Sequence, residues 1–213
     1  MPEGLEAEIW RRGSVPLIGR NIDAVWCDAR VAPDGFAEAL VGGRVIVVRR
    51  AGKVVLIDTS GPTLGLHFGM TGRLVVDGRA PIERLEYSSA ADRAEWDRLR
   101  VETTPAGPGR PALRMNDPRR LGHLSLDPAL DHLGPDLFEV TESSLRATLG
   151  RRRSAIKSAL LDQRVVAGLG NLCADEVLFL SLIHISEPTR PRRQSRMPAS
   201  ACKGGGGGGG GGG

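Results

Sequence analysis

The sequence predicts an α+β protein in which a β-rich domain over residues 1–127 precedes a helical domain over residues 128–180. Two observations carry this prediction. Short runs of alternating or β-branched residues, each ended by Gly, Pro, Asp or Ser, recur through the first 127 residues and are typical of strands. After Asp127 the apolar residues instead follow the helical period. About eight short strands in this space favour a sandwich or a barrel.

The elements follow one another at short spacing. A first helix is expected over Glu3–Arg12, with Leu5, Ile9 and Trp10 on one side and Gly13 ending it. The predicted strands are Ile22–Cys27, Arg44–Val48, Val54–Asp58, Leu64–Phe68, Arg73–Val76, Leu99–Glu102, Ala112–Met115 and His123–Leu126, with a loop over Thr104–Pro111. The other predicted helices are Phe36–Leu40, Ser143–Leu149, Ser154–Leu161 and Asn171–Leu180, the last two joined by a turn over Gly168–Asn171.

Composition limits the function classes. Of the 213 residues, 40% are apolar, which is enough for a core, and no run of 18 apolar residues suggests a membrane span. The charged N-terminus does not resemble a signal peptide, so we expect a cytoplasmic protein. The net charge of +4 arises in residues 181–213, because residues 1–180 hold 24 basic and 24 acidic residues. Binding to nucleic acid must therefore depend on local patches.

The last segment differs from the rest. Ser181–Lys203 has no apolar periodicity, and Gly204–Gly213 is an unbroken glycine run that cannot bury a core. Leu180–Arg190 also resembles the translation of a sequencing-library adapter. We expect residues 181–213 to be a disordered tail that is not a product of the natural gene.

The N-terminal residues Met1-Pro2-Glu3 suggest a nucleophile. If Met1 is removed, Pro2 carries a free secondary amine with a pKa of about 8. Its attack on an aldehyde-like carbon gives an iminium cation, which is an electron sink for elimination. Glu3 and Glu6 lie within reach as proton donors or acceptors. The same residues also suit a plain helix start, since Pro fixes φ and Glu meets the helix dipole.

Five motifs in order give a more specific interpretation. They are Met1-Pro2-Glu3, Arg49-Arg50-Ala51-Gly52-Lys53, Leu66-His67-Phe68-Gly69-Met70-Thr71-Gly72, Asn116-Asp117-Pro118-Arg119-Arg120-Leu121-Gly122, and the segment from Ala155 to Glu176. Together these motifs resemble the formamidopyrimidine-DNA glycosylase and endonuclease VIII family of base-excision repair enzymes. The resemblance implies a β-sandwich with a leading helix, followed by a helix-two-turn-helix module.

The resemblance implies a role for each motif in binding damaged double-stranded DNA. Met70 would be an apolar wedge that fills the space left by a flipped nucleotide, although a core methionine is the alternative. Arg119 would reach the orphaned base and Arg120 a nearby phosphate. His67 would also touch phosphate, and a structural histidine is the alternative. Leu121 stands where the family often has an aromatic residue, which leaves the opposite-base preference open.

The remaining basic residues fit the same interpretation. Residues 1–180 contain 22 arginines but only two lysines, Lys53 and Lys157, which favours a role that needs a compact ammonium. Lys53 would bind the lesion phosphate and assist proton transfer. Arg152, Lys157 and Asn171 would line the DNA face of the helical module, and the amides of the Gly-Leu-Gly-Asn turn would bind phosphate.

The chain also departs from the family. Cys27, Cys173 and Cys202 form no Cys-x-x-Cys pair, so the four-cysteine zinc finger expected of an intact member is absent, and the chain is expected to be truncated, without a cofactor of its own. Trp96-Asp97-Arg98 stands where the family tends to have a His-x-His pair. The lesion, an oxidised purine or pyrimidine, stays open.

The sequence therefore predicts a monomeric DNA glycosylase with apurinic-site lyase activity that acts on the nucleoid through a Pro2 Schiff base. Three alternatives stay open at this point. The chain could be a damaged-DNA or RNA binding module without catalysis, or an inactive truncated fragment. It could also be a different N-terminal-proline enzyme such as a tautomerase, which would not need Lys53, Met70 and Arg119 together.

Overall fold

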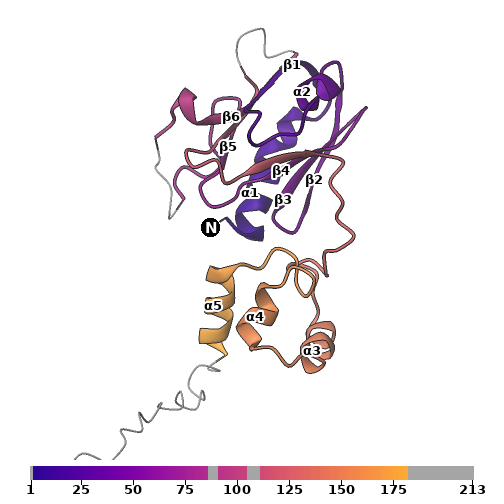
Figure 1. Cartoon of the computed structure of the whole chain (residues 1–213), viewed down its shortest axis with the longest axis vertical. Coiled ribbons are helices and arrows are strands. Elements are labelled where there is room, and N and C mark those ends of the chain that lie inside the picture. Colours follow the sequence, from indigo (N-terminus) through magenta and orange to yellow (C-terminus); the bar gives the residue numbers. More distant parts are fainter. Residues whose placement is uncertain (1, 86–90, 105–110, 182–213) are drawn as a thin grey trace, which may run out of the picture.

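The computed structural model of the chain describes residues 2–85, 91–104 and 111–181. A β-sandwich lies above a smaller helical module, and the N-terminus lies between the two (Figure 1). The predicted tail from residue 182 onward and most of the predicted Thr104–Pro111 loop fall outside these residues. Among the described residues no helix is both long and apolar enough to cross a lipid bilayer.

The sandwich consists of two antiparallel sheets. One has the strand order β1-β6-β7-β5 and the other β2-β3-β4-β8. Its strands are β1 (Asn21–Cys27), β2 (Val45–Ala51), β3 (Val54–Thr59), β4 (Leu64–His67), β5 (Arg73–Val76), β6 (Asp97–Thr104), β7 (Leu113–Asn116) and β8 (His123–Leu126). All eight predicted strands are confirmed. β2 runs on to Ala51 because Arg49, Arg50 and Ala51 continue its pairing with β3.

The helix α1 (Gly4–Ser14) closes the sandwich against both sheets, since it contacts β2 and β3 of one sheet and β5 of the other. Its start is fixed by a capping box, in which Glu6 accepts a 2.7 Å hydrogen bond from the Glu3 backbone N–H. Trp10, fully buried, packs its ring against Phe68 with centroids 3.9 Å apart. The short helices of the sandwich are η1 (Val15–Leu17), α2 (Phe36–Leu40) and η2 (Ala94–Trp96).

The helical module has a core of its own. It contains α3 (Glu142–Gly150), α4 (Ile156–Leu161) and α5 (Asn171–Leu180), as the apolar spacing predicts. The buried residues of this second core are Leu160, Val165, Val166, Leu169, Ala174 and Leu178. The three helices are short, so this small core and the contacts with the sandwich must hold them together.

The junction between sandwich and module is polar and closely packed. Arg50 of β2 makes two 2.6 Å bonds to the carboxylate of Asp136. Gly52, in the turn after β2, has φ +55°, and a Cβ there would lie 3.3 Å from the backbone N of Gly168. The Gly4 N–H donates a 2.8 Å bond to the Gly168 carbonyl. The start of α1 and the β2–β3 turn therefore meet the same point of the helical module.

We predict that Trp10→Ala lowers the free energy of unfolding by about 3–5 kcal/mol, because it leaves a cavity where both sheets meet α1. Trp26→Ala is the matched control, since Trp26 is 47% exposed and its ring contacts only surface groups such as Arg100. That loss should stay below about 1.5 kcal/mol. Urea unfolding followed by far-UV circular dichroism measures both, and equal losses would contradict this account of the core.

Candidate active site

Glu3 lies at the junction, and its side chain is 2% exposed. Its carboxylate accepts hydrogen bonds from the backbone N–H groups of Gly170 (2.9 Å), Leu172 (2.7 Å) and Cys173 (3.2 Å). These are the amides at the N-terminus of α5, where the helix dipole favours a negative charge. Within the Gly168–Asn171 turn that was predicted to bind phosphate, the Gly170 N–H is thus bonded to Glu3, and the Gly168 N–H is bonded to the Gln163 side chain. Phosphate binding by this turn stays a prediction.

Two glycines make this contact possible. A Cβ on Gly170 would lie 2.3 Å from Cδ of Glu3, and a Cβ on Gly4 would lie 2.1 Å from Cδ2 of Leu137. Real Cβ atoms do not approach other atoms so closely, so larger residues would separate α1 from α5. Pro2, which is buried, precedes this contact directly and is therefore held between the two parts of the fold.

Lys53 lies in the turn between β2 and β3, at the same junction. Its burial lowers the pKa of its ammonium, and the nearby Glu3, Cys173 and Glu6 partly oppose this shift. The structure thus brings Lys53 together with both glutamates that the sequence singled out. An ammonium with a lowered pKa gives up its proton more readily than that of an exposed lysine.

Cys173 belongs to this cluster but was missed by the sequence analysis. Burial first, and then its side-chain hydrogen bond with Glu3, raise the pKa of the Cys173 thiol to about 12. The thiol is therefore a neutral donor toward the carboxylate, not a nucleophile. In the sequence, only the position of Cys173, two residues after Asn171 in the first turn of α5, could have indicated its contact with Glu3.

His67, on β4, stacks on His123 of β8 with ring centroids 4.6 Å apart. Its Nδ1 accepts a 3.2 Å bond from the Gly69 N–H. Burial, with smaller effects from His123 and Lys53, lowers the pKa of His67 to about 4. Both rings and Lys53 line a cavity of about 250 Å³ that also reaches His132. His67 is therefore neutral at physiological pH and keeps Nε2 for a further contact.

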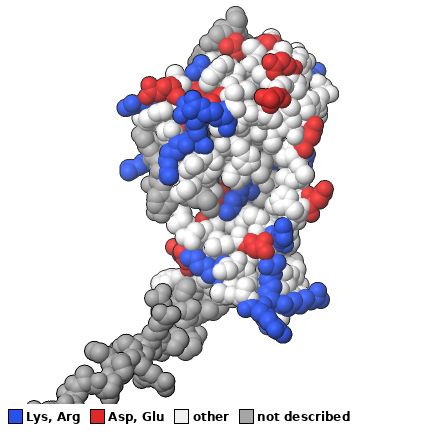
Figure 2. Space-filling model, in the orientation of Figure 1, with Lys and Arg blue, Asp and Glu red and all other residues white. Residues whose placement is uncertain are grey.

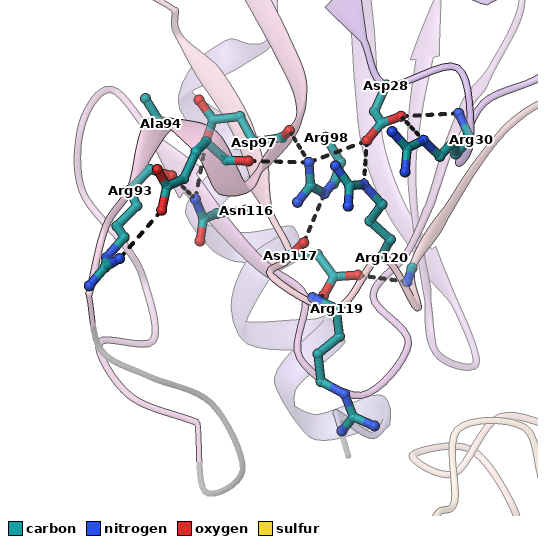
Figure 3. Close-up of polar contacts among 12 residues, drawn as sticks. Asp28, Arg30, Arg93, Ala94, Asp97, Arg98, Asn116, Asp117, Arg119 and Arg120 are labelled. Atoms are coloured by element: carbon teal, nitrogen blue, oxygen red, sulfur yellow. Dashed lines mark hydrogen bonds and ion pairs between the residues drawn. The ribbon is translucent and has the colours of Figure 1, made fainter.

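Two neighbouring loops carry Met70, Arg119 and Leu121, the residues predicted to act where the nucleotide is flipped out. Met70 is 40% exposed in the β4–β5 turn, and Leu121 is 42% exposed in the β7–β8 loop. The Arg119 side chain points away from the surrounding polar network (Figure 3). Within the described part of the chain, no hydrogen bond or ion pair of its guanidinium is found. The structure thus brings these three side chains to one edge of the sandwich, free to contact a ligand.

Arg120 follows in the same loop but is bound within the protein. Its Nε donates a 2.8 Å bond to Asp28, which also accepts a 3.2 Å bond from Arg98 (Figure 3). The hydrogen bond from Arg120 is the main reason that the pKa of Asp28 is lowered. In the Trp96-Asp97-Arg98 segment, which stands where the family tends to have a His-x-His pair, Asp97 and Arg98 are buried and Trp96 is half-buried. The sequence analysis missed the structural role of Asp28 and Arg98.

The predicted residues of the helical module are also held in ion pairs. Lys157 lies 2.6 Å from Asp175, which accepts a 3.1 Å bond from Asn171 as well. Arg152 instead pairs with Asp162 at 2.8 Å. The structure therefore brings Lys157 and Asn171 together on one face and places Arg152 in a separate pair. Figure 2 shows basic side chains gathered at the lower end of this module, where α3 lies in Figure 1.

Two sequence profiles of known protein domains match this chain. The sequence profile of the formamidopyrimidine-DNA glycosylase N-terminal domain matches residues 1–124, and that of the H2TH domain of the same proteins matches residues 133–200. The chain belongs to the formamidopyrimidine-DNA glycosylase family. Family membership places it among the DNA glycosylases of base-excision repair. The H2TH match extends into residues 182–200, which lie outside the described structure, and the assignment of residues 181–213 as a tail stays a prediction.

Individual relatives agree with the family. The formamidopyrimidine-DNA glycosylase of Cereibacter sphaeroides is 38% identical over 198 residues, which cover 84% of this chain and 67% of that protein. The enzyme of the same name from Acidithiobacillus ferrooxidans is 35% identical over 212 residues. The structure of Lactococcus lactis Fpg with N7-benzyl-Fapy-dG DNA has a TM-score of 0.66 at 26% identity, over 84% of this chain and 67% of that one. Its complex with abasic-site DNA gives 0.65 at 28%.

The family's zinc finger cannot be built from the residues that the structure describes. Cys27 lies on β1 and Cys173 on α5, in different parts of the fold. Over residues 2–85, 91–104 and 111–181, no group of three or more His, Cys, Asp or Glu side chains could hold a metal ion. These residues do not fit a zinc site, so no step of the mechanism is assigned to a metal.

The lowered pKa of His67 predicts a pH dependence of stability. As pH falls below about 6.5, the unfolded chain takes up this proton before the folded chain does, and stability is lost down to the folded pKa of about 4. The contribution of His67 to the loss between pH 7 and pH 5 should be about 2 kcal/mol and should be absent in His67→Gln, whereas the contribution of His123, whose pKa burial also lowers, remains. His132→Gln, at an exposed histidine, is the control. Thermal unfolding across this range measures the effect, and an unchanged dependence in His67→Gln would contradict the assignment.

Proposed function

We propose that the chain is a bifunctional DNA glycosylase and apurinic-site lyase that removes oxidised bases through a Schiff base on Pro2. One observation carries the proposal: Pro2 is buried at the junction between sandwich and helical module, directly before Glu3, whose fixed carboxylate lies near enough to Lys53 to oppose the lowering of its pKa. A nucleophilic amine, a carboxylate and an amine with a lowered pKa in one place are the groups that such a reaction needs.

The reaction would proceed in two stages. The Pro2 nitrogen bonds to C1′ of the damaged nucleotide while the bond from C1′ to the base breaks, and the base leaves with that electron pair and takes a proton. The C1′–O4′ bond then opens as Pro2 loses its proton and becomes an iminium. The Glu3 carboxylate takes the proton that Pro2 loses and passes it to O4′. Loss of a proton from C2′ then expels the 3′ phosphate, which cuts the strand.

Lys53 would serve this second stage. Its ammonium can bind the phosphate beside the lesion, and its lowered pKa eases transfer of the proton during elimination. The neutral His67 would add a hydrogen bond to the same backbone through Nε2. Glu6, which caps the backbone N–H of Glu3, would act by holding Glu3 and so fixing the direction of α1.

Damaged double-stranded DNA is the proposed partner. The Lactococcus lactis structures contain Fapy-dG-type, oxidised-pyrimidine and abasic-site DNA, which supports a damaged nucleotide as the substrate. Met70, Arg119 and Leu121 project from one edge of the sandwich and would fill the space left by the flipped nucleotide. The phosphate backbone of the DNA would also be contacted by Arg120, Arg152, Lys157 and Asn171.

A binding module without catalysis would use the same outer surface. It would not need Pro2 buried beside Lys53 and Glu3, and this arrangement favours the enzyme. A tautomerase would need the proline but not the three projecting residues Met70, Arg119 and Leu121.

Borohydride reduction in the presence of abasic-site DNA tests the proposal. The chain with Met1 removed, as verified by mass spectrometry, should form a covalent complex of protein and DNA. Pro2→Gly should reduce the yield at least about tenfold, because a glycine amine gives an imine that is neutral unless protonated. Pro16→Gly, which alters an exposed proline in η1 beyond the other end of α1, is the control and should trap like the unaltered chain.

Two outcomes would contradict the proposal that Pro2 forms a Schiff base with DNA. Binding of abasic-site DNA without any trapped complex would favour the binding module. Trapping that is equal in Pro2→Gly and the unaltered chain would assign the Schiff base to another amine, with Lys53 as the first to test.

A further inference from the structure

Asp117 connects the two loops that carry the projecting residues. It is fully buried, and the Thr71 hydroxyl of the β4–β5 turn donates a hydrogen bond to its Oδ1. Its Oδ2 accepts 2.8 Å bonds from the backbone N–H groups of both Leu121 and Gly122 in the β7–β8 loop. The Arg119 N–H adds a 3.2 Å bond to Oδ1. One carboxylate therefore binds one loop through a side chain and the other through its backbone.

The backbones of the two loops also touch. Gly69 has φ +58°, and a Cβ there would lie 2.3 Å from the Leu121 carbonyl oxygen. A Cβ on Gly122 would lie 2.7 Å from the His67 carbonyl oxygen. No space is left between the loops for a side chain, so neither can shift without displacing the other.

A second carboxylate holds the outer side of the β7–β8 loop. Buried Arg98 donates a 2.8 Å bond to the Asp117 carbonyl and a 3.2 Å bond to Asp28. Asp28 in turn accepts the 2.8 Å bond from Arg120, a residue with φ +53° (Figure 3). The loop is thus fixed by Asp28, which follows β1 directly, and by Arg98 of β6, as well as by Asp117.

We propose that Asp117 is a positioning residue that couples Met70 to Arg119 and Leu121, so that the three side chains enter a damaged duplex as one rigid unit. The inference rests on the proposed function, because it assumes that these side chains replace a flipped nucleotide. A unit fixed before binding loses less conformational freedom when it enters the helix than two separate loops would. Truncation of one side chain then weakens the insertion of the others.

A double-mutant cycle in two backgrounds tests the coupling. Met70→Ala, Arg119→Ala and the pair are compared by the Kd for a duplex that contains a stable abasic analogue opposite fluorescent 2-aminopurine. In the otherwise unaltered chain, the double variant should bind at least about fivefold better than the product of the two single losses predicts. In the Thr71→Val background, which removes the hydroxyl donor to Asp117, the losses should multiply to within about twofold.

Two further variants make the test specific. Thr103→Val also removes a buried threonine hydroxyl, and within the described residues that hydroxyl has no hydrogen-bond partner, so coupling should persist. Thr71→Ser keeps the donor and should restore coupling. The change in 2-aminopurine fluorescence on binding should fall in Thr71→Val and be retained in both other variants. Thermal unfolding confirms that all are folded, whereas Asp117→Asn places an amide against backbone N–H groups and should unfold the loop.

The outcomes separate the two proposals. Equal coupling in Thr71→Val and Thr103→Val would overturn the role of Asp117 while abasic-site DNA is still bound and trapped. Failure of the proposed function would instead appear as equal affinity of the unaltered chain for abasic and intact duplexes, and would remove both proposals.

Discussion

The bonds between the Glu3 carboxylate and the first amides of α5 are the interaction on which the rest of the structure depends. They join the third residue of the chain to residues 170–173, which belong to the other half of the fold. The backbone N–H of Glu3 is taken by Glu6, so main chain and side chain are fixed at once. Because Pro2 precedes Glu3 directly, its position follows from this contact.

The same contact determines the electrostatics of the site. A carboxylate at a helix N-terminus is stabilised by the dipole and needs no buried cation beside it. Lys53 lies near Glu3, and within the described residues no ion pair of its ammonium is found. Burial lowers the pKa of Lys53. By contrast, Arg50, one turn of the hairpin away, is bound tightly by Asp136 and serves the junction between the two parts of the fold. The two cations differ in function because their partners differ.

The edge that carries Met70, Arg119 and Leu121 follows a related design. Exposed side chains that would contact DNA are mounted on backbone held by two carboxylates, the buried Asp117 within the loops and the half-buried Asp28 beside them. The Arg119 guanidinium is left without an internal partner in the described structure, whereas that of Arg120 is oriented by Asp28. Fixed backbone beneath exposed side chains is what insertion into a stacked duplex requires.

Local patterns were sufficient to predict the elements of this fold. Alternating or β-branched runs ended by Gly, Pro, Asp or Ser predicted all eight strands. A half-buried strand shows the alternation, whereas a strand such as β5, buried at all four residues, shows a short apolar run. The approach of Pro2, Glu3 and Lys53 was predicted only through the family resemblance, since 50 residues separate them in sequence. The roles of Asp28, Asp117 and Cys173 were not predicted, because a lone polar residue shows no periodicity and its partners come from distant strands. Nothing local shows that Glu3 reaches the Gly170 amide, and the phosphate role given to the Gly-Leu-Gly-Asn amides stays a prediction.

Amide hydrogen exchange of Gly170, Leu172 and Cys173 tests the central claim most directly. The account predicts that Glu3→Gln lowers the protection of these amides at least about tenfold, because an amide group places a donor where two N–H groups need an acceptor. Glu142→Gln, in the exposed first turn of α3, should leave them unchanged. Equal protection in Glu3→Gln and the unaltered chain would show that the carboxylate does not hold the N-terminus against α5, and would contradict the account.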